Sequence, residues 1–218
     1  MCCPTQSPGA PTCSSQPASP SPTSPAGSPT AGAARLFATL LLSLRGSVCL
    51  YQGEELGLPE ADVPFEALQD PYGIQFWPEY KGRDGCRTPM VWTPEVPTGG
   101  FTEVTPWLPV SAAHLPLSAA NQEADPASTL AHYRRMIALR KAHPALIKGA
   151  LIGLAAAGDL LRFERRHGGE RLFCAFNMGE APVTVALPRG GWESLEGPDA
   201  RSGEVKLQAW GVLIARQA

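Results

Sequence analysis

The chain has 218 residues, of which 44% are hydrophobic and 17% are charged, and its formal net charge at pH 7 is -2. This length predicts one domain or two small ones, and the apolar fraction is sufficient for a hydrophobic core. A net charge so close to zero argues against nucleic acid or an anionic membrane surface as a partner. The six cysteines are widely scattered, which argues against a disulfide framework and favours a reduced, cytoplasmic protein.

Residues 1–34 differ in composition from the rest of the chain. They contain no Lys, Arg, Asp, Glu or His, and they hold eight Pro and seven Ser. Such a segment cannot bury enough apolar surface to offset the entropy lost on ordering, so we expect residues 1–32 to form a disordered tail. No basic segment of the secretory type begins the chain, and the apolar run Leu36–Leu44 is shorter than the roughly 20 residues that cross a membrane.

The first predicted elements are a helix and a strand. Residues 33–45 predict a helix because leucines recur at helical spacing among strong helix formers and Gly46 follows as a stop signal. Residues 47–51 (SVCLY) predict a short buried strand. A helix followed by such a strand is typical of a parallel α/β sheet, in which ligand sites gather just after the strand ends. The polar residues 52–57 lie at such a position.

A long connection and a second helix follow. Residues 57–124 hold ten prolines and most of the aromatic residues, and they predict an ordered, folded-back loop with no long regular element. Residues 125–147 predict a helix with Asp125 as its N-cap and Pro126 at its first position. Its basic residues, including Arg140, are expected to face water or to extend towards it, and Pro144 is expected to kink or end the helix.

In the last part of the chain, the spacing of apolar residues changes from the helical period to the two-residue period of strands. Apolar residues alternate with polar ones around Phe163, Cys174, Val185, Val205 and Ile214, which predicts five strands, and residues 167–170 predict a hairpin turn between the first two. We therefore expect an α/β segment over residues 33–147 and a small antiparallel β-sandwich over residues 148–218.

Two groups of charged residues are candidates for chemistry. Glu54 and Glu55 could serve as paired carboxylates, although neighbouring residues on a strand point to opposite faces, which favours a structural role. The loop that holds Arg83, Asp84 and Arg87 offers guanidinium donors for hydroxyl or carboxylate groups. The alternative is that Asp84 pairs with Arg87 and stabilises the loop, and the two interpretations are compatible.

The aromatic residues of the long loop could stack on sugar rings, or they could form the core of the loop, which the composition favours. The four histidines and the cysteines show no metal-ligand spacing, so no metal site is predicted. The sequence also contains no phosphate-binding loop, dinucleotide motif or nucleophile elbow.

Three ordered motifs resemble glycoside hydrolase family 13, in particular its bacterial α-glucosidase and oligo-1,6-glucosidase branch. They are Leu50–Gly57 (LYQGEELG), Gly82–Trp92 (GRDGCRTPMVW) and Pro106–Pro109 (PWLP), and Phe65–Gly73 (FEALQDPYG) is similar to the α-glucosidases specifically. The resemblance covers about residues 33 to 218.

The resemblance implies a (β/α)₈ barrel of which residues 33–45, 47–51 and 125–147 are the seventh helix, eighth strand and eighth helix, followed by the family's C-terminal β-sandwich. It implies that Arg83 binds beside the terminal glucose, together with an Asp from an early barrel loop, and that Glu60 faces the aglycone side. The implied substrate is an α-glucoside or a small malto- or isomalto-oligosaccharide, and the implied reaction is retaining hydrolysis without an organic cofactor.

The chain departs from the family in its catalytic residues. The family's nucleophile, acid/base and third carboxylate all precede the segment that corresponds to residue 33, and no Asn-His-Asp sequence occurs in the chain. A closed barrel needs about 250 residues. We therefore expect a C-terminal fragment with a partial barrel and no catalytic residues, inactive alone. The alternative is a non-catalytic carbohydrate-binding or interaction protein derived from the same family.

Overall fold

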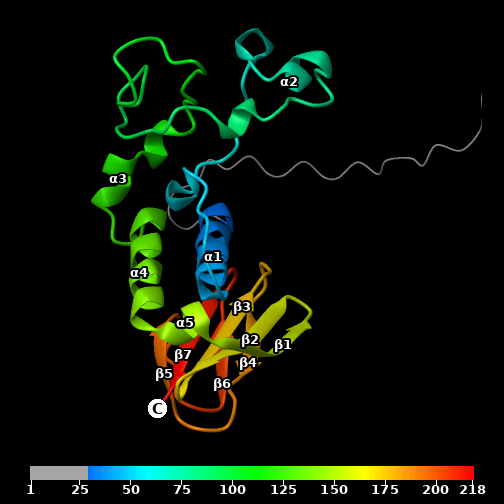
Figure 1. Ribbon diagram of the computed structural model, residues 1–218, viewed down its shortest axis with the longest axis vertical. Coiled ribbons are helices and arrows are strands. Elements are labelled where there is room, and N and C mark those ends of the chain that lie inside the picture. The colour runs from blue at the N-terminus through cyan, green and yellow to red at the C-terminus, as the bar shows by residue number, and fades with distance from the viewer. Residues whose placement is uncertain (1–28) are drawn as a thin grey trace, which may run out of the picture.

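The computed structural model describes residues 29–218 and consists of two long helices standing on a β-sandwich, with an extended loop region at the opposite end (Figure 1). The predicted tail lies outside the described residues except for residues 29–32, which are helical. The α-helices are α1 (Pro29–Ser43), α2 (Pro71–Gln75), α3 (Ala119–Glu123), α4 (Thr129–Ala142) and α5 (Pro144–Lys148). The 3₁₀ helices are η1 (Glu54–Leu56), η2 (Phe65–Ala67), η3 (Asp84–Cys86) and η4 (Leu115–Leu117).

The predicted strand at residues 47–51 is absent, which corrects the expected helix–strand pair. The segment is extended, but it is not part of any β-ladder among the described residues. An apolar sequence favours the extended conformation, whereas a strand requires a neighbouring backbone with which to exchange hydrogen bonds. The long loop that follows is ordered, as predicted, and contains short helices from η1 to α3.

The start of the second long helix is also corrected. Asp125 accepts a hydrogen bond from the Ala127 amide in a turn that precedes the helix, and Ser128 is the actual N-cap, since its hydroxyl accepts from the Ala131 amide at 3.1 Å. Ser and Asp are both good N-caps, so composition alone does not choose between them. The helix ends at Ala142, and Pro144 begins the separate helix α5, as a proline at that position allows.

Arg140 is buried, contrary to the expectation that it faces water. Its guanidinium donates to the carbonyls of Leu42 (2.6 Å) and Leu44 (2.7 Å), to that of Leu146 (3.0 Å) and to that of Gly46. The last carbonyls of a helix find no hydrogen-bond donor within the helix. At the end of α1 the Arg140 guanidinium of α4 donates these hydrogen bonds, and its positive charge suits the negative end of the helix dipole. Arg140 therefore joins α1, α4 and α5.

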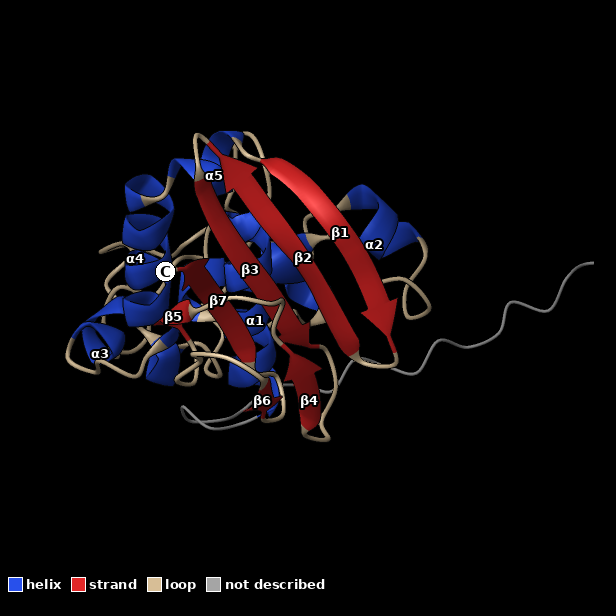
Figure 2. Cartoon of the chain, turned by 90° about the horizontal axis from the view of Figure 1, so that it is seen from below, coloured by secondary structure: helices blue, strands red, loops and turns tan. Residues whose placement is uncertain are grey.

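The β-sandwich consists of a five-stranded antiparallel sheet in the order β1-β2-β3-β7-β5 and a two-stranded sheet of β4 and β6 (Figure 2). The strands are β1 (Ala150–Ala157), β2 (Leu160–His167), β3 (Glu170–Asn177), β4 (Val183–Ala186), β5 (Trp192–Glu196), β6 (Glu204–Leu207) and β7 (Val212–Gln217). The five predicted strands are present, and the turn between β2 and β3 is Gly168-Gly169. Strands β1 and β5 were not predicted.

Strand β3 is buried on both faces. Leu172, Cys174 and Phe176 pack against α1, α4 and α5, whereas Phe173 and Ala175 face the two-stranded sheet. Alternation along a strand places these two sets on opposite faces, and here each face meets a hydrophobic layer. One continuous core therefore joins the helices to the sandwich across the predicted boundary between residues 147 and 148.

His132 of α4 lies in the contact between the two long helices and is buried. The Thr39 hydroxyl donates to the Arg35 carbonyl at 2.9 Å, so the Nε2 of His132, which lies 2.8 Å from that hydroxyl oxygen, is the protonated nitrogen. Nδ1 lies 3.5 Å from a guanidinium nitrogen of Arg135, which can only donate, so Nδ1 is the acceptor, the imidazole is neutral and Nε2 donates to α1. Burial, together with the nearby Arg135 guanidinium, lowers the pKa of His132 to about 4.

We expect the chain to lose stability between pH 6.5 and pH 4. The unfolded state takes up a proton at the ordinary His pKa of 6.5, whereas folded His132 takes it up near 4. The free energy of unfolding should fall by about 2–3 kcal/mol over this interval. Urea unfolding at pH 7 and pH 4.5 measures this change. In His132→Gln most of the dependence should disappear, leaving a smaller one of the same sign from His114, whose pKa burial also lowers. An unchanged dependence would contradict the assignment. Burial raises the pKa of Glu196, so protonation of this residue favours the folded state as the pH falls. This smaller, opposite contribution to the stability should remain in the variant.

Candidate functional site

The loop around η3 is held close to α2 by two glycines. A Cβ on Gly73 would lie 2.6 Å from the Lys81 carbonyl oxygen, and one on Gly82, whose φ is +75°, would lie 2.9 Å from the Asp70 Cβ. These separations are too short for any side chain, so the two backbones approach each other as closely as they do because both residues are glycine. This contact places Arg83 directly beside Asp70.

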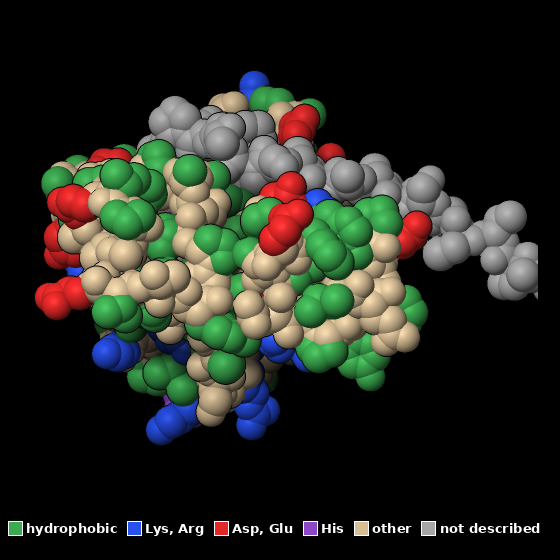
Figure 3. All heavy atoms as spheres, turned by 90° about the horizontal axis from the view of Figure 1, so that it is seen from above, with side chains coloured by type: hydrophobic (Ala, Val, Ile, Leu, Met, Phe, Trp, Pro, Cys, Tyr) green, Lys and Arg blue, Asp and Glu red, His purple; other side chains and the backbone are tan. Residues whose placement is uncertain are grey.

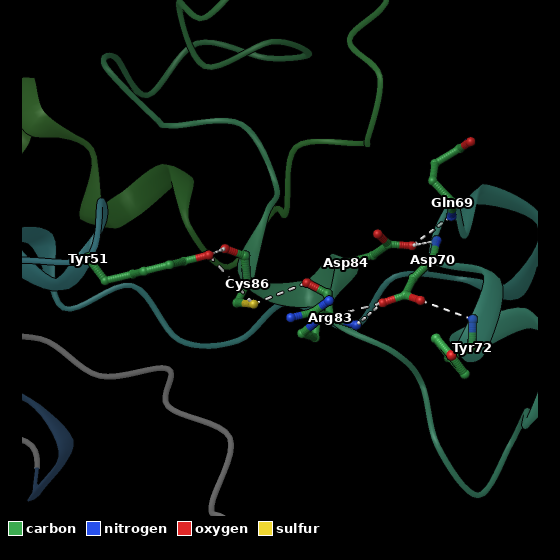
Figure 4. Close-up of polar contacts among 7 residues, drawn as sticks. All are labelled: Tyr51, Gln69, Asp70, Tyr72, Arg83, Asp84 and Cys86. Atoms are coloured by element: carbon green, nitrogen blue, oxygen red, sulfur yellow. Dashed lines mark hydrogen bonds and ion pairs between the residues drawn. The ribbon is translucent and has the colours of Figure 1, made fainter.

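The carboxylates of Asp84 and Asp70 stabilise this contact between α2 and the loop around η3 by hydrogen bonds (Figure 4). Buried Asp84 accepts from the amides of Gln69 (2.6 Å) and Asp70 (2.7 Å) through Oδ2. In return, Asp70 accepts from the Arg83 amide (3.0 Å) and the Tyr72 amide (3.0 Å). These bonds stabilise the ionised form, and chiefly that from Arg83 lowers the pKa of Asp70 below its ordinary value. Asp84 thus stabilises the loop, as the alternative interpretation held, but it does so through the backbone amides of Gln69 and Asp70 and not through an ion pair with Arg87.

The side chain of Arg83 remains available at the surface. It is 68% exposed, and its Nε lies 4.0 Å from Asp70 Oδ2. Glu60, the other predicted site residue, is also exposed and lies against the same turn, since a Cβ on Gly85 would be 2.7 Å from the Glu60 Cγ. The structure therefore brings Glu60 against the middle of the η3 turn, with Arg83 at the start of the same turn.

Tyr51 connects this turn to the end of the segment that follows α1. Its hydroxyl donates to the Cys86 carbonyl at 3.2 Å, and the Cys86 thiol donates to the Arg83 carbonyl at 3.1 Å. The hydroxyl also lies 3.9 Å from the Cys86 thiol, and this side-chain contact is the main cause of the raised pKa of Tyr51. Sequence reasoning missed both Tyr51 and Asp70 as parts of the site, because their contacts join residues that lie 13 to 35 positions apart.

Glu54 and Glu55 do not form a catalytic pair in this structure. They lie in the 3₁₀ helix η1 rather than on a strand end, and Glu55 accepts a hydrogen bond from the Gly53 amide at 2.8 Å. Glu54 is exposed at the edge of a groove lined by α1 and Tyr133. This arrangement agrees with the structural alternative, in which one carboxylate caps a turn and the other is solvated.

The aromatic residues of the loop region are mostly exposed, which corrects the expectation that they form its core. Tyr72 (64%), Trp107 (66%) and Trp92 (51%) are exposed, and the rings of Tyr72 and Phe76 stack with centroids 6.3 Å apart. The small core of this region consists instead of aliphatic residues with Trp77 beside them, namely Val63, Leu68 and Leu108. Viewed from the loop end, hydrophobic side chains lie on the surface among acidic ones (Figure 3).

Three histidines of residues 29–218, His114, His132 and His143, are buried and contact other protein groups. His114 contacts the Pro59 carbonyl at 2.8 Å, and His143 contacts the Glu170 carboxylate at 2.5 Å. In this part of the chain no group of three or more His, Cys, Asp or Glu residues is arranged to hold a metal ion. No helix within the described range is long and apolar enough to cross a membrane. The cysteines at positions 2, 3 and 13 lie outside the described residues.

The described chain thus combines two long helices and a charged loop with a C-terminal β-sandwich. The chain matches the model of the α-amylase catalytic domain over residues 24–149 and that of a domain of unknown function, DUF3459, over residues 153–214. The chain therefore belongs to the α-amylase family, glycoside hydrolase family 13, as the three motifs predicted.

Curated relatives bear names from the predicted branch. A probable α-glucosidase of Rhizobium meliloti is 57% identical over 189 residues, which are 85% of this chain and 34% of that protein. An oligo-1,6-glucosidase of Halalkalibacterium halodurans is 32% identical over 180 residues, 71% of this chain and 32% of that protein. The chain thus spans about a third of the length of these relatives.

Solved structures share the fold. The α-glucosyl transfer enzyme XgtA is 46% identical with a TM-score of 0.81, and the match covers 87% of this chain and 36% of that one. An isomaltulose synthase from Klebsiella sp. LX3 is 25% identical with a TM-score of 0.78, over 87% of this chain and 38% of that one. The partial barrel followed by a β-sandwich is therefore the correct fold class.

Proposed function

We propose that this chain is the C-terminal part of an α-glucosidase-type retaining glycoside hydrolase, in which Arg83 binds the terminal glucose of an α-glucoside. The observation that carries the proposal is the geometry of Arg83. Its backbone is fixed by Asp70 and its guanidinium is left exposed, which suits a residue that donates to sugar hydroxyls. Glu60, which lies against Gly85 of the same turn, is proposed to contact the aglycone.

The 218 residues by themselves are proposed to be inactive. Retaining hydrolysis needs a nucleophilic carboxylate and a general acid about 5–5.5 Å apart, and the acid needs a raised pKa. Asp70 and Asp84 accept hydrogen bonds from backbone amides, and the pKa of Asp70 is lowered rather than raised. Asp70 is therefore not suited to protonate a leaving group, and Asp84 is buried with its Oδ2 held by two backbone amides. Both observations support an origin of the catalytic acids outside this segment.

The release of p-nitrophenol from p-nitrophenyl α-glucoside tests both parts of the proposal. The purified chain should release none above buffer, and turnover would contradict its proposed inactivity. A chimera of the R. meliloti relative, in which the aligned region is replaced by residues 29–218, should hydrolyse the glucoside. A folded but inert chimera would contradict the α-glucosidase assignment.

A non-catalytic carbohydrate-binding protein is the second candidate, and the exposed stacked rings of Tyr72 and Phe76 favour it. Such a pair offers an apolar surface to a sugar ring, next to the polar groups of Asp70 and Arg83. Glucose or maltose binding by the chain alone, lost in Arg83→Ala and unaccompanied by turnover in the chimera, would support this second function over the first.

A further inference from the structure

Strand β1 lies at one edge of the five-stranded sheet (Figure 2). It pairs with β2 on one side, and no strand of residues 29–218 pairs with its other side. Sheet edges are commonly protected by charged residues or proline, which discourage pairing with another chain. The sequence of β1, ALIGLAAA, contains neither, and its large side chains are exposed, namely Leu151 (39%), Ile152 (39%) and Leu154 (61%). Strand β1 is therefore an apolar edge without these protecting residues.

The register of β1 shows which of its backbone groups point away from β2. The two-residue turn Gly158–Asp159 makes Ala157 and Leu160 the closing pair of a hairpin, whose backbone groups bond to each other. Bonded and non-bonded pairs alternate along an antiparallel ladder. Ala156, which lies opposite Leu161, therefore directs its amide and carbonyl outwards.

Leu151 has the same orientation on the other side of a bulge. The register of β1 shifts at this bulge, which includes Gly153 with a φ of +64°. Beyond it Leu151 lies opposite Arg165, which belongs to the same alternate set of β2 residues as Leu161. Leu151 therefore also directs its backbone groups outwards, as Ala156 does. Within residues 29–218 neither residue forms a backbone hydrogen bond outside the β1–β2 ladder.

We propose that two copies of this chain associate through β1, as antiparallel strands related by a two-fold axis that passes between Gly153 and Leu154. Leu151 of one copy then lies opposite Ala156 of the other, and the same pair recurs on the far side of the axis. The two five-stranded sheets join into one continuous sheet. This association goes beyond the proposed function and does not depend on it.

The choice of a second copy as the occupant follows from the symmetry of the edge. A two-fold contact requires a surface that is complementary to itself. The regular stretches on either side of the bulge, residues 150–152 and 155–157, are equally long, so Leu151 and Ala156 lie equally far from the axis and their outward groups meet in register. At the axis the bulge meets its own copy, and the space around Gly153 is open, since a Cβ there would have no atom within 4 Å.

The charges at the two ends of β1 favour the same antiparallel arrangement. Lys148 precedes the strand, whereas Asp159 follows it and lies against Gly179, next to Glu180. Lys148, Asp159 and Glu180 are exposed, and none of them forms an ion pair within the described residues. In an antiparallel pair the basic end of each strand meets the acidic end of the other, so the charges attract at both ends of the contact.

The test is analytical ultracentrifugation of the full 218-residue chain. A contact through one strand is small, so we expect a reversible dimer with a Kd of about 10–100 µM. Hydrogen exchange of the peptide that contains β1 should slow about tenfold at concentrations well above this Kd, because the outward amides become paired. A chain that stays monomeric at these concentrations, or a dimer in which β1 exchanges as fast as in the monomer, would overturn the proposal.

Two kinds of variant locate the contact. Ala156→Pro should abolish the dimer, because proline removes the outward amide hydrogen and is tolerated on an edge strand. Lys148→Asp should weaken the dimer at least about fivefold at low ionic strength, and adding Asp159→Lys should restore most of the loss. Lys141→Asp is the matched control and should have no effect, since Lys141 is also an exposed lysine in the last turn of a helix, α4.

Phe37→Asp separates β1 from another exposed apolar surface of the chain, the side of α1 on which Phe37 is 52% exposed. This variant should dimerise like the parent. A dimer that is lost in Phe37→Asp but kept in Ala156→Pro would contradict the proposal, as would equal effects of Lys148→Asp and Lys141→Asp. Circular dichroism of each variant checks folding, and the charge reversal with its restoration decides if Ala156→Pro does not fold.

Discussion

Replacing Arg140 by methionine is expected to lower the free energy of unfolding of the chain by about 3–5 kcal/mol. The guanidinium is the hydrogen-bond donor for carbonyls at the end of α1 and for the Leu146 carbonyl of α5. Methionine fills much of the space but donates no hydrogen bond, so several buried acceptors lose their partner at once. Urea unfolding at pH 7, followed by far-UV circular dichroism, measures the loss.

Arg134→Met is the matched control for this prediction. Arg134 lies on the same helix and forms a bidentate ion pair with Glu123 at 2.8 and 2.7 Å, but the two side chains are 58% and 57% exposed. Exposed ion pairs contribute about 0–1 kcal/mol, so this variant should remain close to the parent. Similar losses for the two variants would mean that Arg140 does not join the three helices as described.

Replacing Arg83 by alanine is expected to lower kcat/KM of the active chimera about 100-fold on p-nitrophenyl α-glucoside. Charge-assisted hydrogen bonds contribute about 1.5–3 kcal/mol each, and alanine removes every donor of the guanidinium. The effect should arise in binding and not in folding, because the guanidinium is 68% exposed and lies 4.0 Å from Asp70. The thermal midpoint of the variant should therefore stay close to that of the parent.

Lys81→Ala is the control for Arg83. Lys81 lies two residues away, and its amine pairs with Asp62 at 2.6 Å across an exposed contact. Loss of this charge should change kcat/KM less than about twofold, as expected for a surface ion pair. If Arg83→Ala kept more than half of the activity, or if Lys81→Ala lost as much, Arg83 would not be the residue that holds the glucose.

Local signals identified much of the fold correctly. The alternation around Phe163 and Cys174 predicted β2 and β3 because side chains on a strand face opposite sides in turn. Strand β1 escaped prediction because the sequence ALIGLAAA is rich in alanine and glycine, which are poor strand formers, and its conformation comes from pairing with β2. Conversely, residues 47–51 have a strand-like sequence but no partner strand.

The candidate site also has parts that the sequence predicted and parts that it did not. Arg83 and Glu60 were assigned from the resemblance to the family, and the structure brings both to the η3 turn, while their roles towards a sugar stay predictions. The role of Asp70 was not predictable from its own surroundings, because it depends on a contact with a residue 13 positions away. The loop aromatics, expected inside, lie outside, because the folded loop buries aliphatic side chains and leaves Tyr72 and Trp92 exposed.

The amino-acid sequence alone determined the family, the helix and strand periods and the position of the charged loop, because these depend on residues that are close together in the chain. Only the tertiary structure decided that Arg140 is buried and that Asp70 holds Arg83. Only the tertiary structure also decided that Ser47–Leu50 pairs with no strand of residues 29–218. Each of these outcomes depends on which distant backbone donors and acceptors come within hydrogen-bonding distance, and local sequence patterns do not encode that distance.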